Sequence, residues 1–309
     1  MTILITGSNG FVGSNLIKGL SGKYKIDGID LPGNRSQGLN NFFIWEDLDS
    51  LEGYDVVIHL AGKAHDLRRS SNPQSYFDVN LGLTKKIFDW YIKSGSKYFI
   101  FFSSVKAVAD TLDSKVLTED FLPDPKTPYG KSKLAAEKYI LAQELSVNRC
   151  VYILRPCMIH GPGNKGNLNL LYKFLSKGLP YPLGAFNNLR SYLSVSNLSW
   201  VIERIIEGQA PSGIYNLADD EPVSTNELIQ LISESTNKKP RIWNIPSGLI
   251  NILARTGDIL RLPFNTERLR KLTESYIVSN TKLKNALGVK NLPFSSREGL
   301  IQTFKYLAQ

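Results

Sequence analysis

Tyr129 and Lys133 have the residue types and the spacing needed to move a proton to or from an alcohol or ketone. Residues four positions apart on a helix share one face, and an ammonium group beside a phenol lowers the pKa of the phenol by stabilising the phenolate. Ser104 follows an apolar run 25 residues upstream, and its hydroxyl could hydrogen-bond the same substrate oxygen. The adjacent Ser103 is the weaker candidate. We therefore predict that Ser104, Tyr129 and Lys133 form an acid–base group.

Three glycines near the N-terminus have the spacing of a phosphate-binding turn. Gly7 permits a tight turn, Gly10 lets the backbone approach a pyrophosphate, and Gly13 lets the following helix pack close to the preceding strand. The phosphates of a dinucleotide would then lie at the positive N-terminus of that helix. The predicted contact residues are Gly7, Gly10, Phe11, Val12 and Gly13.

Asp30, at the end of the second predicted strand, indicates which dinucleotide is bound. A carboxylate there accepts hydrogen bonds from the ribose hydroxyls of the adenosine and repels a 2′-phosphate, which favours NAD over NADP. Arg35 is near enough in the sequence to accommodate a 2′-phosphate, so NADP stays an alternative. Asp47 and Leu48, after the third predicted strand, are candidates for contact with the adenine, the alternative for Asp47 being an ordinary solvated carboxylate.

These residues lie at the ends of predicted strands that alternate with predicted helices, a pattern typical of a doubly wound parallel sheet of the Rossmann type. Strands are predicted at 2–6, 24–29, 42–45, 56–60, 98–102, 151–154, 191–195 and 214–216. Helices are predicted at 11–20, 74–93, 128–145, 168–176, 198–207, 225–236 and 296–307. We expect a dinucleotide-binding domain of residues 1–157 plus about 191–217. A smaller, mixed substrate-binding cap, about 158–190 and 218–309, would cover the C-terminal ends of the strands.

The net charge of +9 is confined to the last quarter of the chain. From Lys238 onward there are 13 Lys and Arg residues against 4 Asp and Glu, and the remainder is neutral. The excess positive charge either forms an ordinary solvated surface or attracts phosphate-bearing ligands or an anionic membrane surface. Nucleic acid is not an expected partner, because no recognised DNA- or RNA-binding motif accompanies the charge.

The longest mostly apolar stretch, residues 247–264, contains Arg255, Asp258 and Arg261 and is therefore not predicted to span a membrane. Its spacing suits an amphipathic helix packed on the protein itself. The N-terminus has no pattern of a signal peptide, and two cysteines predict neither a disulfide framework nor a metal site. We expect a cytoplasmic protein.

Several motifs together resemble the extended short-chain dehydrogenase/reductase family, the NAD-dependent epimerase/dehydratase group. They are TGSNGFVG at 6–13, HLAG at 59–62, Asn80, FFSS at 101–104, PYGKSK at 128–133 and RP at 155–156. The resemblance implies that Leu60, Ala61 and Gly62 line the cofactor, that Asn80 supports it, and that Tyr129 and Lys133 also contact it, Lys133 through the nicotinamide ribose. His59 is expected to be structural.

The segment 155–195 resembles the substrate arm of enzymes that act on UDP-sugars. This resemblance implies that Asn167 contacts the diphosphate and that Arg190 contacts the ribose-phosphate portion, as suits bidentate arginine–phosphate recognition. Either residue could instead be an ordinary polar group of a loop. A basic residue from 268–271 would complete the phosphate site, and a homodimer is the expectation for the family.

The run Ser-Ser-Val-Lys at 103–106 resembles bacterial polysaccharide enzymes that reduce a UDP-4-keto-6-deoxy-N-acetylhexosamine, although Ala107 replaces their usual glycine. Lys106 would orient the keto oxygen or the diphosphate, the alternative being an ordinary solvated lysine at a strand end. Related dehydratases have an Asp-Glu pair where this chain has Val105 and Lys106, so dehydration is not expected. A reductase is favoured, a UDP-hexose 4-epimerase with tightly bound NAD is the alternative, and a non-catalytic nucleotide-binding protein is a third hypothesis.

Overall fold

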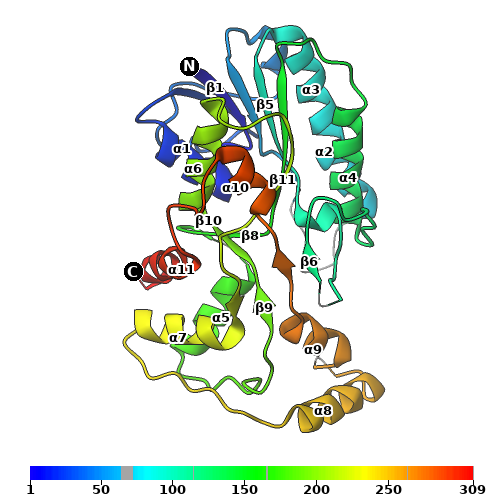
Figure 1. Ribbon diagram of the computed structural model, residues 1–309, viewed down its shortest axis with the longest axis vertical. Coiled ribbons are helices and arrows are strands. Elements are labelled where there is room, and N and C mark those ends of the chain that lie inside the picture. The colour runs from blue at the N-terminus through cyan, green and yellow to red at the C-terminus, as the bar shows by residue number, and fades with distance from the viewer. Residues whose placement is uncertain (64–71, 114, 165, 263, 309) are drawn as a thin grey trace.

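The computed structural model has a seven-stranded parallel sheet with helices on both faces and a smaller part beyond one end of the sheet (Figure 1). It describes residues 1–63, 72–113, 115–164, 166–262 and 264–308. The strand order is β11-β7-β5-β4-β1-β2-β3. The strands are β1 (Thr2–Thr6), β2 (Lys25–Ile29), β3 (Phe42–Phe43), β4 (Val56–His59), β5 (Tyr98–Phe102), β7 (Cys150–Pro156) and β11 (Gly213–Leu217). The predicted doubly wound α/β fold is confirmed.

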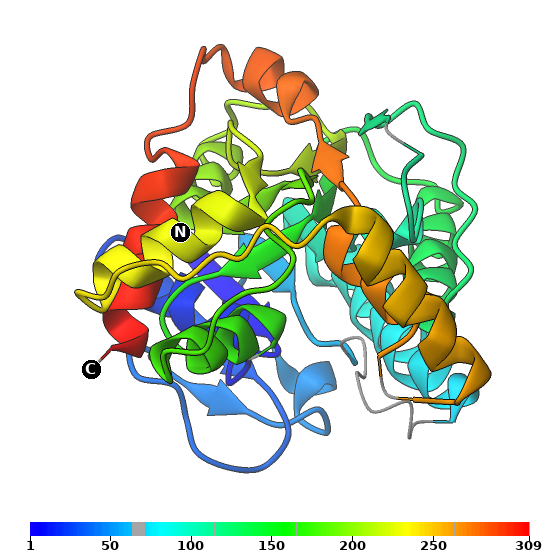
Figure 2. The same cartoon turned by 90° about the horizontal axis from the view of Figure 1, so that it is seen from below.

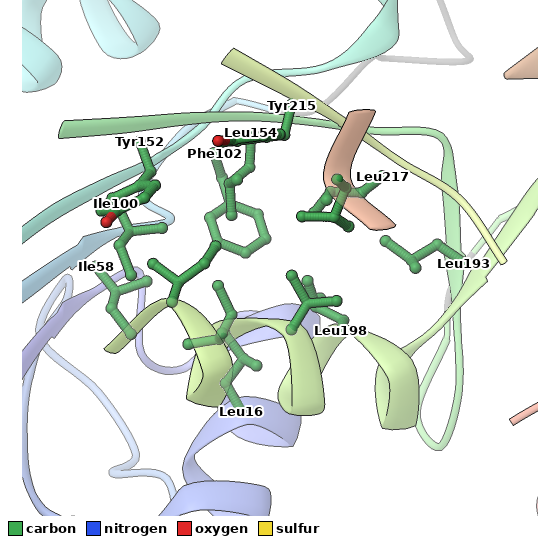
Figure 3. Close-up of a cluster of buried hydrophobic side chains, with 14 of the residues drawn as sticks. Leu16, Ile58, Ile100, Phe102, Tyr152, Leu154, Leu193, Leu198, Tyr215 and Leu217 are labelled. Carbon is green, nitrogen blue, oxygen red and sulfur yellow. The ribbon is translucent and has the colours of Figure 1, made fainter. Parts of the chain in front are cut away.

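Two layers of helices bury the two faces of this sheet. One layer contains α1 (Phe11–Leu20) and α6 (Val195–Ile206), and the other contains α2 (Pro73–Asn80), α3 (Gly82–Ser94) and α4 (Pro128–Leu141). Figure 3 shows Ile58 and Ile100 of the sheet facing Leu16 and Leu198 of the first layer. Strands buried on both faces need continuous apolar runs, which explains the sequences of β4 and β5.

Two predicted helices differ from the observed ones. The predicted helix at 74–93 is divided into α2 and α3, which meet at Leu81. The predicted helix at 128–145 ends at Leu141, and the side chains of Leu141 and Val147 are exposed rather than packed on the protein. Helix stability in proteins comes mainly from such packing.

The remaining chain forms short strands and helices beyond the C-terminal ends of the sheet. The strands are β6 (Val116–Leu117), β8 (Met158–His160), β9 (Leu189–Arg190), β10 (Tyr192–Ser194), β12 (Val223–Ser224) and β13 (Ile277–Val278). The helices are α5 (Asn167–Ser176), α7 (Thr225–Ser235), α8 (Ser247–Ile259), α9 (Thr266–Thr273), α10 (Thr281–Leu287) and α11 (Ser296–Leu307). Leu283 and Leu287 of α10 pack into the core beneath the sheet. The division into a nucleotide domain and a cap stays a proposal.

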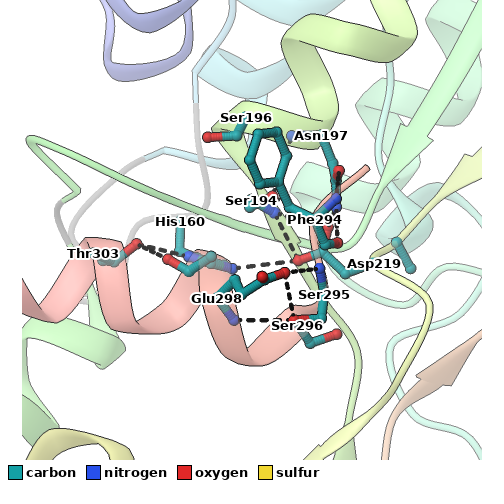
Figure 4. A network of polar contacts seen from close by, with 12 residues as sticks. His160, Ser194, Ser196, Asn197, Asp219, Phe294, Ser295, Ser296, Glu298 and Thr303 are labelled. Carbon is teal, nitrogen blue, oxygen red and sulfur yellow. Dashed lines mark hydrogen bonds and ion pairs between the residues drawn. The ribbon is translucent and has the colours of Figure 1, made fainter. Parts of the chain in front are cut away.

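A buried polar network joins α11 to β8, β10 and α6 (Figure 4). The carboxylate of Asp219 accepts hydrogen bonds from Ser194 N at 3.0 Å and Asn197 Nδ2 at 2.7 Å, and its Oδ2 lies 3.6 Å from His160 Nε2. His160 Nδ1 lies 2.9 Å from the hydroxyl of Thr303 in α11. Buried polar groups need such partners, so the network fixes the end of the chain against the strands that lead into the predicted substrate arm.

Candidate active site

The glycine turn after β1 leaves no room for side chains. Gly7 has φ +72°, and a Cβ on it would lie 2.7 Å from Ala61 N. A Cβ on Gly13 would lie 2.4 Å from the carbonyl oxygen of Gly7, so α1 packs directly on the turn. Gly10 is the N-cap of α1 and offers no side-chain cap. The first backbone N–H groups of α1, which begins with Phe11 and Val12, therefore form a site suited to a pyrophosphate.

Asp30 follows β2 and borders an open hollow of about 440 Å³ together with Asn9 and residues 31–36. Its carboxylate accepts hydrogen bonds from Asn9 N at 2.7 Å and Leu31 N at 2.8 Å. Arg35 Nη2 donates to the carbonyl oxygens of Leu39 and Asn40 at 2.5 and 3.2 Å. The hollow is therefore bordered by the Asp30 carboxylate and by Arg35, whose guanidinium is already engaged by carbonyl oxygens of its own loop.

Asp47 and Leu48 lie where the chain enters the short 3₁₀ turn Leu48–Ser50. The carboxylate of Asp47 accepts a hydrogen bond from Ile44 N at 3.0 Å. The side chain of Leu48 is fully buried in the core between the sheet and α3. A cofactor contact at Leu48 would therefore have to use its backbone.

The loop after β4 is held by Asn80, the last residue of α2. Asn80 is fully buried, its Oδ1 accepts a hydrogen bond from Lys63 N at 2.7 Å, and its Nδ2 donates to Ser132 Oγ at 2.9 Å. A Cβ on Gly62 would lie 2.9 Å from Asn80 Oδ1 and 3.2 Å from Lys133 Nζ. The structure thus brings Gly62, Asn80 and Lys133 together; Leu60 and Ala61 precede Gly62 in the same loop.

Ser104, Tyr129 and Lys133 also converge, from the end of β5 and the first turns of α4. Tyr129 is hydrogen-bonded to Ser104, which lowers the phenol pKa, but burial has the larger effect and raises it. Lys133 Nζ donates to the carbonyl oxygen of Phe102 at 2.8 Å, and burial lowers its pKa to about 8. The ammonium group of Lys133 binds a backbone carbonyl in this geometry, and its effect on the pKa of Tyr129 stays a prediction.

A buried ion pair behind Lys133 was not predicted. Arg155 Nη2 lies 2.6 Å from Glu137 Oε2 and Arg155 Nε lies 3.0 Å from Glu137 Oε1, while the hydroxyl of Ser103 donates to the same carboxylate. This contact gives Ser103 a supporting role in the fold. Two signals were present in the sequence: Glu137 follows Lys133 by one helical turn, and Arg155 is a charge at the end of a strand with an apolar run.

Lys106 lies on the 3₁₀ turn Val105–Ala107 that follows Ser104. Its Nζ donates to the carbonyl oxygen of Asp110 at 2.7 Å and lies 3.9 Å from the centre of the Tyr276 ring. Burial lowers the pKa of Lys106 to about 8, and the charge of Arg190 lowers it further against the opposing effects of Asp110 and Glu274. Sequence reasoning missed Tyr276, which β13 brings near the site.

Arg190 and Asn167 occupy different parts of the predicted substrate arm. Arg190 donates from Nε to the carbonyl oxygen of Glu274 at 3.2 Å and from Nη2 to that of Lys271, at the end of α9. Its charge also influences Lys106. Asn167 is exposed at the first position of α5. The structure therefore groups Arg190 with Lys106 but does not bring Asn167 into hydrogen-bond contact with them within the described residues.

The basic residues at 268–271, predicted to complete the phosphate site, differ in their surroundings. Arg268 and Arg270 are exposed on α9. Lys271 pairs through Nζ with Glu267 at 2.7 Å, and its carbonyl oxygen accepts the hydrogen bond from Arg190. Which of these three residues, if any, completes a phosphate site with Arg190 stays a prediction.

Comparison with known proteins agrees with this geometry. A model of the NAD dependent epimerase/dehydratase family matches residues 3–218. A UDP-glucose 4-epimerase of Vibrio cholerae is 31% identical and is covered over 96% of its length by the whole of this chain. An N-acetyl-α-D-glucosaminyl-diphospho-ditrans,octacis-undecaprenol 4-epimerase of Escherichia coli O157:H7 is 28% identical, with 98% of this chain and 94% of that protein covered. The structure of MoeE5 with UDP-glucuronic acid and NAD has a similar fold, with a TM-score of 0.77, 22% identity and 99% of both chains covered.

Proposed function

The chain belongs to the NAD-dependent epimerase/dehydratase family, and on that premise we propose that it transfers hydride at C4 of a sugar attached to a diphosphate, as a 4-epimerase. The observation that carries the proposal is the convergence of Ser104, Tyr129 and Lys133 beside the glycine turn. A protein without catalytic activity would not require acid–base groups next to a nucleotide-binding turn.

The residues present fit a bound NAD. The pyrophosphate would lie on the glycine turn, Asp30 would accept hydrogen bonds from the adenosine ribose, and Asp47 with the backbone of Leu48 would contact the adenine. The loop 60–62 and Asn80 would support the nicotinamide end, and Lys133 would bind its ribose. NAD would supply the acceptor for the C4 hydride and return the hydride to C4.

The protein's own side chains would handle the proton that accompanies this hydride. Tyr129 would remove the proton of the C4 hydroxyl while Ser104 hydrogen-bonds the same oxygen, so that loss of hydride and proton leaves a ketone. Tyr129 would give the proton back when the hydride returns. If the sugar presents its other face in between, the product is the C4 epimer and no cofactor is consumed.

Two cations could bind the substrate's diphosphate. Lys106 and Arg190 lie close enough for the charge of one to lower the pKa of the other. Two like charges at one site destabilise each other until an anion lies between them. Both relatives described above act on sugars attached to diphosphates, one through UDP and the other through undecaprenol. We favour a UDP-sugar, with Asn167 as a further contact once substrate is bound.

A 4-keto sugar reductase is the second candidate. It is supported by the Ser-Ser-Val-Lys run at 103–106, and a GDP-6-deoxy-D-mannose reductase is a more distant relative at 25% identity. Sequence reasoning favoured the reductase, whereas the relatives that cover nearly the whole chain favour the epimerase. The site residues serve either reaction, because both use one proton transfer for each hydride transfer.

Proton NMR of UDP-sugar mixtures tests the proposal. The protein with catalytic NAD is incubated separately with UDP-glucose and with UDP-N-acetylglucosamine. We expect conversion of at least one to its galacto epimer, with no net change in absorbance at the NADH band. Stoichiometric oxidation of NADH with a UDP-4-keto-6-deoxy sugar, and no epimerisation, would instead establish the reductase. Inactivity in both assays, with NAD shown to be bound, would contradict hydride transfer to these UDP-sugars.

A further inference from the structure

Helix α8 exposes a continuous apolar stripe. Its members recur at helical spacings of three, four and seven residues, and more than half of each residue's surface is exposed. They are Leu249, Ile252, Leu253 and Ile259, followed by Leu260 directly after the helix. No other described element covers this stripe, and contiguous exposed apolar surface of this kind marks an interaction site. The prediction that α8 is amphipathic is therefore correct, but its packing on the protein uses other residues.

A different stripe fixes α8 to the protein. Ile250, Ala254 and Gly257 are the buried residues of the helix. A Cβ on Gly257 would lie 1.8 Å from the carbonyl oxygen of Phe264, so the backbones are in close contact there. The exposed stripe points away from this contact, since its centre lies roughly 120° around the helix axis from the buried stripe at 100° per residue. Its apolar residues therefore contribute little to folding.

Positive charges surround the apolar stripe. Arg255 lies beside it on α8, Arg261 follows the helix, and α9, which packs against α8, adds exposed Arg268 and Arg270. Figures 1 and 2 show α8 and α9 together at the end of the molecule opposite the sheet. Residues 247–273 hold five Lys and Arg residues against Asp258 and Glu267, so this end of the molecule contributes a net +3 of the chain's +9. The acidic neighbours are fewer, and Glu267 is already paired with Lys271.

We propose that α8 and α9 dock the protein on an anionic lipid bilayer, with the apolar stripe of α8 inserted between the headgroups and the arginines bound to lipid phosphates. An apolar face flanked by Arg is the pattern of a helix that lies in the plane of a membrane interface. Each Lys or Arg near an anionic surface adds attraction. Among the described residues no helix is long and apolar enough to cross a membrane, so the contact is peripheral.

Charge distinguishes the bilayer from a second copy of the chain as the occupant. A symmetric dimer through this face would bring two copies of the same net positive patch together, and like charges across an interface are destabilising. An anionic bilayer instead offers complementary charge and an apolar interior to the same surface. Docking would also bring the substrate arm to the membrane, because Arg190 is hydrogen-bonded to the C-terminal end of α9.

Vesicle flotation without any sugar substrate tests this docking. Vesicles of phosphatidylcholine with 30% phosphatidylglycerol are compared with vesicles of pure phosphatidylcholine, at low and at high salt. We expect the wild-type protein to float with the anionic vesicles and its partitioning to fall at least about tenfold on the neutral ones or at high salt. Ile252→Glu with Leu253→Glu, and separately Arg268→Glu with Arg270→Glu, should each reduce partitioning by at least about tenfold.

Matched controls separate docking from general charge or folding effects. Leu122→Glu places the same change on an exposed leucine elsewhere, and Lys18→Glu with Lys305→Glu changes the net charge equally without touching α8 or α9. These variants should float nearly as the wild type does, and all variants should keep the wild-type melting temperature and NAD affinity. Equal flotation of the α8 variants and the wild type would overturn the proposal. So would sedimentation showing a dimer that the Ile252 and Leu253 changes dissociate.

Discussion

Glu137 and Arg155 form a buried, bidentate ion pair directly behind the proposed catalytic lysine. Both side chains are less than 5% exposed, and the two hydrogen bonds measure 2.6 and 3.0 Å. Glu137 lies one helical turn after Lys133, and its charge raises the pKa of that lysine against the larger lowering effect of burial. The pair therefore helps to keep Lys133 protonated while it holds α4 against β7.

Removing this carboxylate should destabilise the fold strongly. Glu137→Gln leaves the Arg155 guanidinium buried without a counter-charge, and breaking a buried pair in this way costs about 3–5 kcal/mol. The free energy of unfolding in urea measures the loss. Glu234→Gln is the matched control, because it removes an ion pair with Arg297 that is about half exposed and should cost less than about 1 kcal/mol. Equal losses in the two variants would contradict this account.

Replacing the proposed acid–base group should remove activity without unfolding the protein. Tyr129→Phe keeps the ring that packs edge-on against Tyr76 but cannot transfer a proton, so turnover should fall at least about 100-fold. Initial rates with the substrate identified by NMR measure the effect. Tyr139→Phe is the control, because its hydroxyl lies on the same helix and is hydrogen-bonded to Asp89 on the outer surface. Near-normal turnover of Tyr129→Phe would remove this residue from the mechanism.

Local patterns in the sequence were enough to predict the sheet and the centre of the site. The apolar runs of β4 and β5 permit few structures other than buried strands. The spacing of Tyr129 and Lys133 places them on one face of any helix that contains both. Gly13 was interpretable for the same reason, since it packs on the backbone of Gly7 only six residues away.

Contacts between distant segments could not be predicted in this way. Tyr276 packs on Lys106 because its segment pairs with β6 and with Arg190, and nothing near Tyr276 or Lys106 in the sequence encodes those pairings. The Lys133 ammonium group binds the carbonyl oxygen of Phe102. The spacing of Tyr129 and Lys133 in the sequence does not decide between that carbonyl and the Tyr129 phenol as its partner.

The charge of Asp30 should determine which dinucleotide is preferred. Asp30→Asn keeps a hydrogen-bond acceptor for Asn9 N but removes the repulsion of a 2′-phosphate. The preference for NADH over NADPH should then narrow by at least about tenfold, or about 1.4 kcal/mol. Calorimetric dissociation constants for both cofactors test this, with the exposed Asp49→Asn as control. A wild-type protein that binds NADPH more tightly than NADH would contradict the role of Asp30.

Binding of UDP should weaken as the pH rises through the pKa of Lys106. Burial lowers this pKa to about 8, so the charge is present below pH 8 and is lost above it. If the ammonium binds the diphosphate, affinity for UDP should fall by up to about tenfold between pH 7 and pH 9. Calorimetry with NAD present measures it. Lys106→Met should bind UDP weakly at both pH 7 and pH 9. Lys106→Arg should bind UDP equally well at the two pH values. If UDP binding to Lys106→Met kept the wild-type pH dependence, that dependence would come from another group.

The residues after Ser104 should prevent dehydration of the sugar. Elimination of water across C5 and C6 requires a base for the C5 proton and an acid for the departing hydroxyl. Val105 is buried and cannot transfer a proton. The ammonium group of Lys106 donates to the carbonyl of Asp110 and lies over the Tyr276 ring, so it is a donor here and not a base for the C5 proton.

We therefore expect hydride transfer at C4 with no loss of water from UDP-N-acetylglucosamine or dTDP-glucose. Mass spectrometry of the products, with NAD added, is the measurement, and every product should keep the mass of its substrate. The double variant Val105→Asp with Lys106→Glu supplies the two missing carboxylates and controls for detection of a dehydrated product. A mass decrease of one water with the wild-type protein would show that another pair of groups performs the elimination. Val105 and Lys106 would then no longer distinguish this protein from a dehydratase.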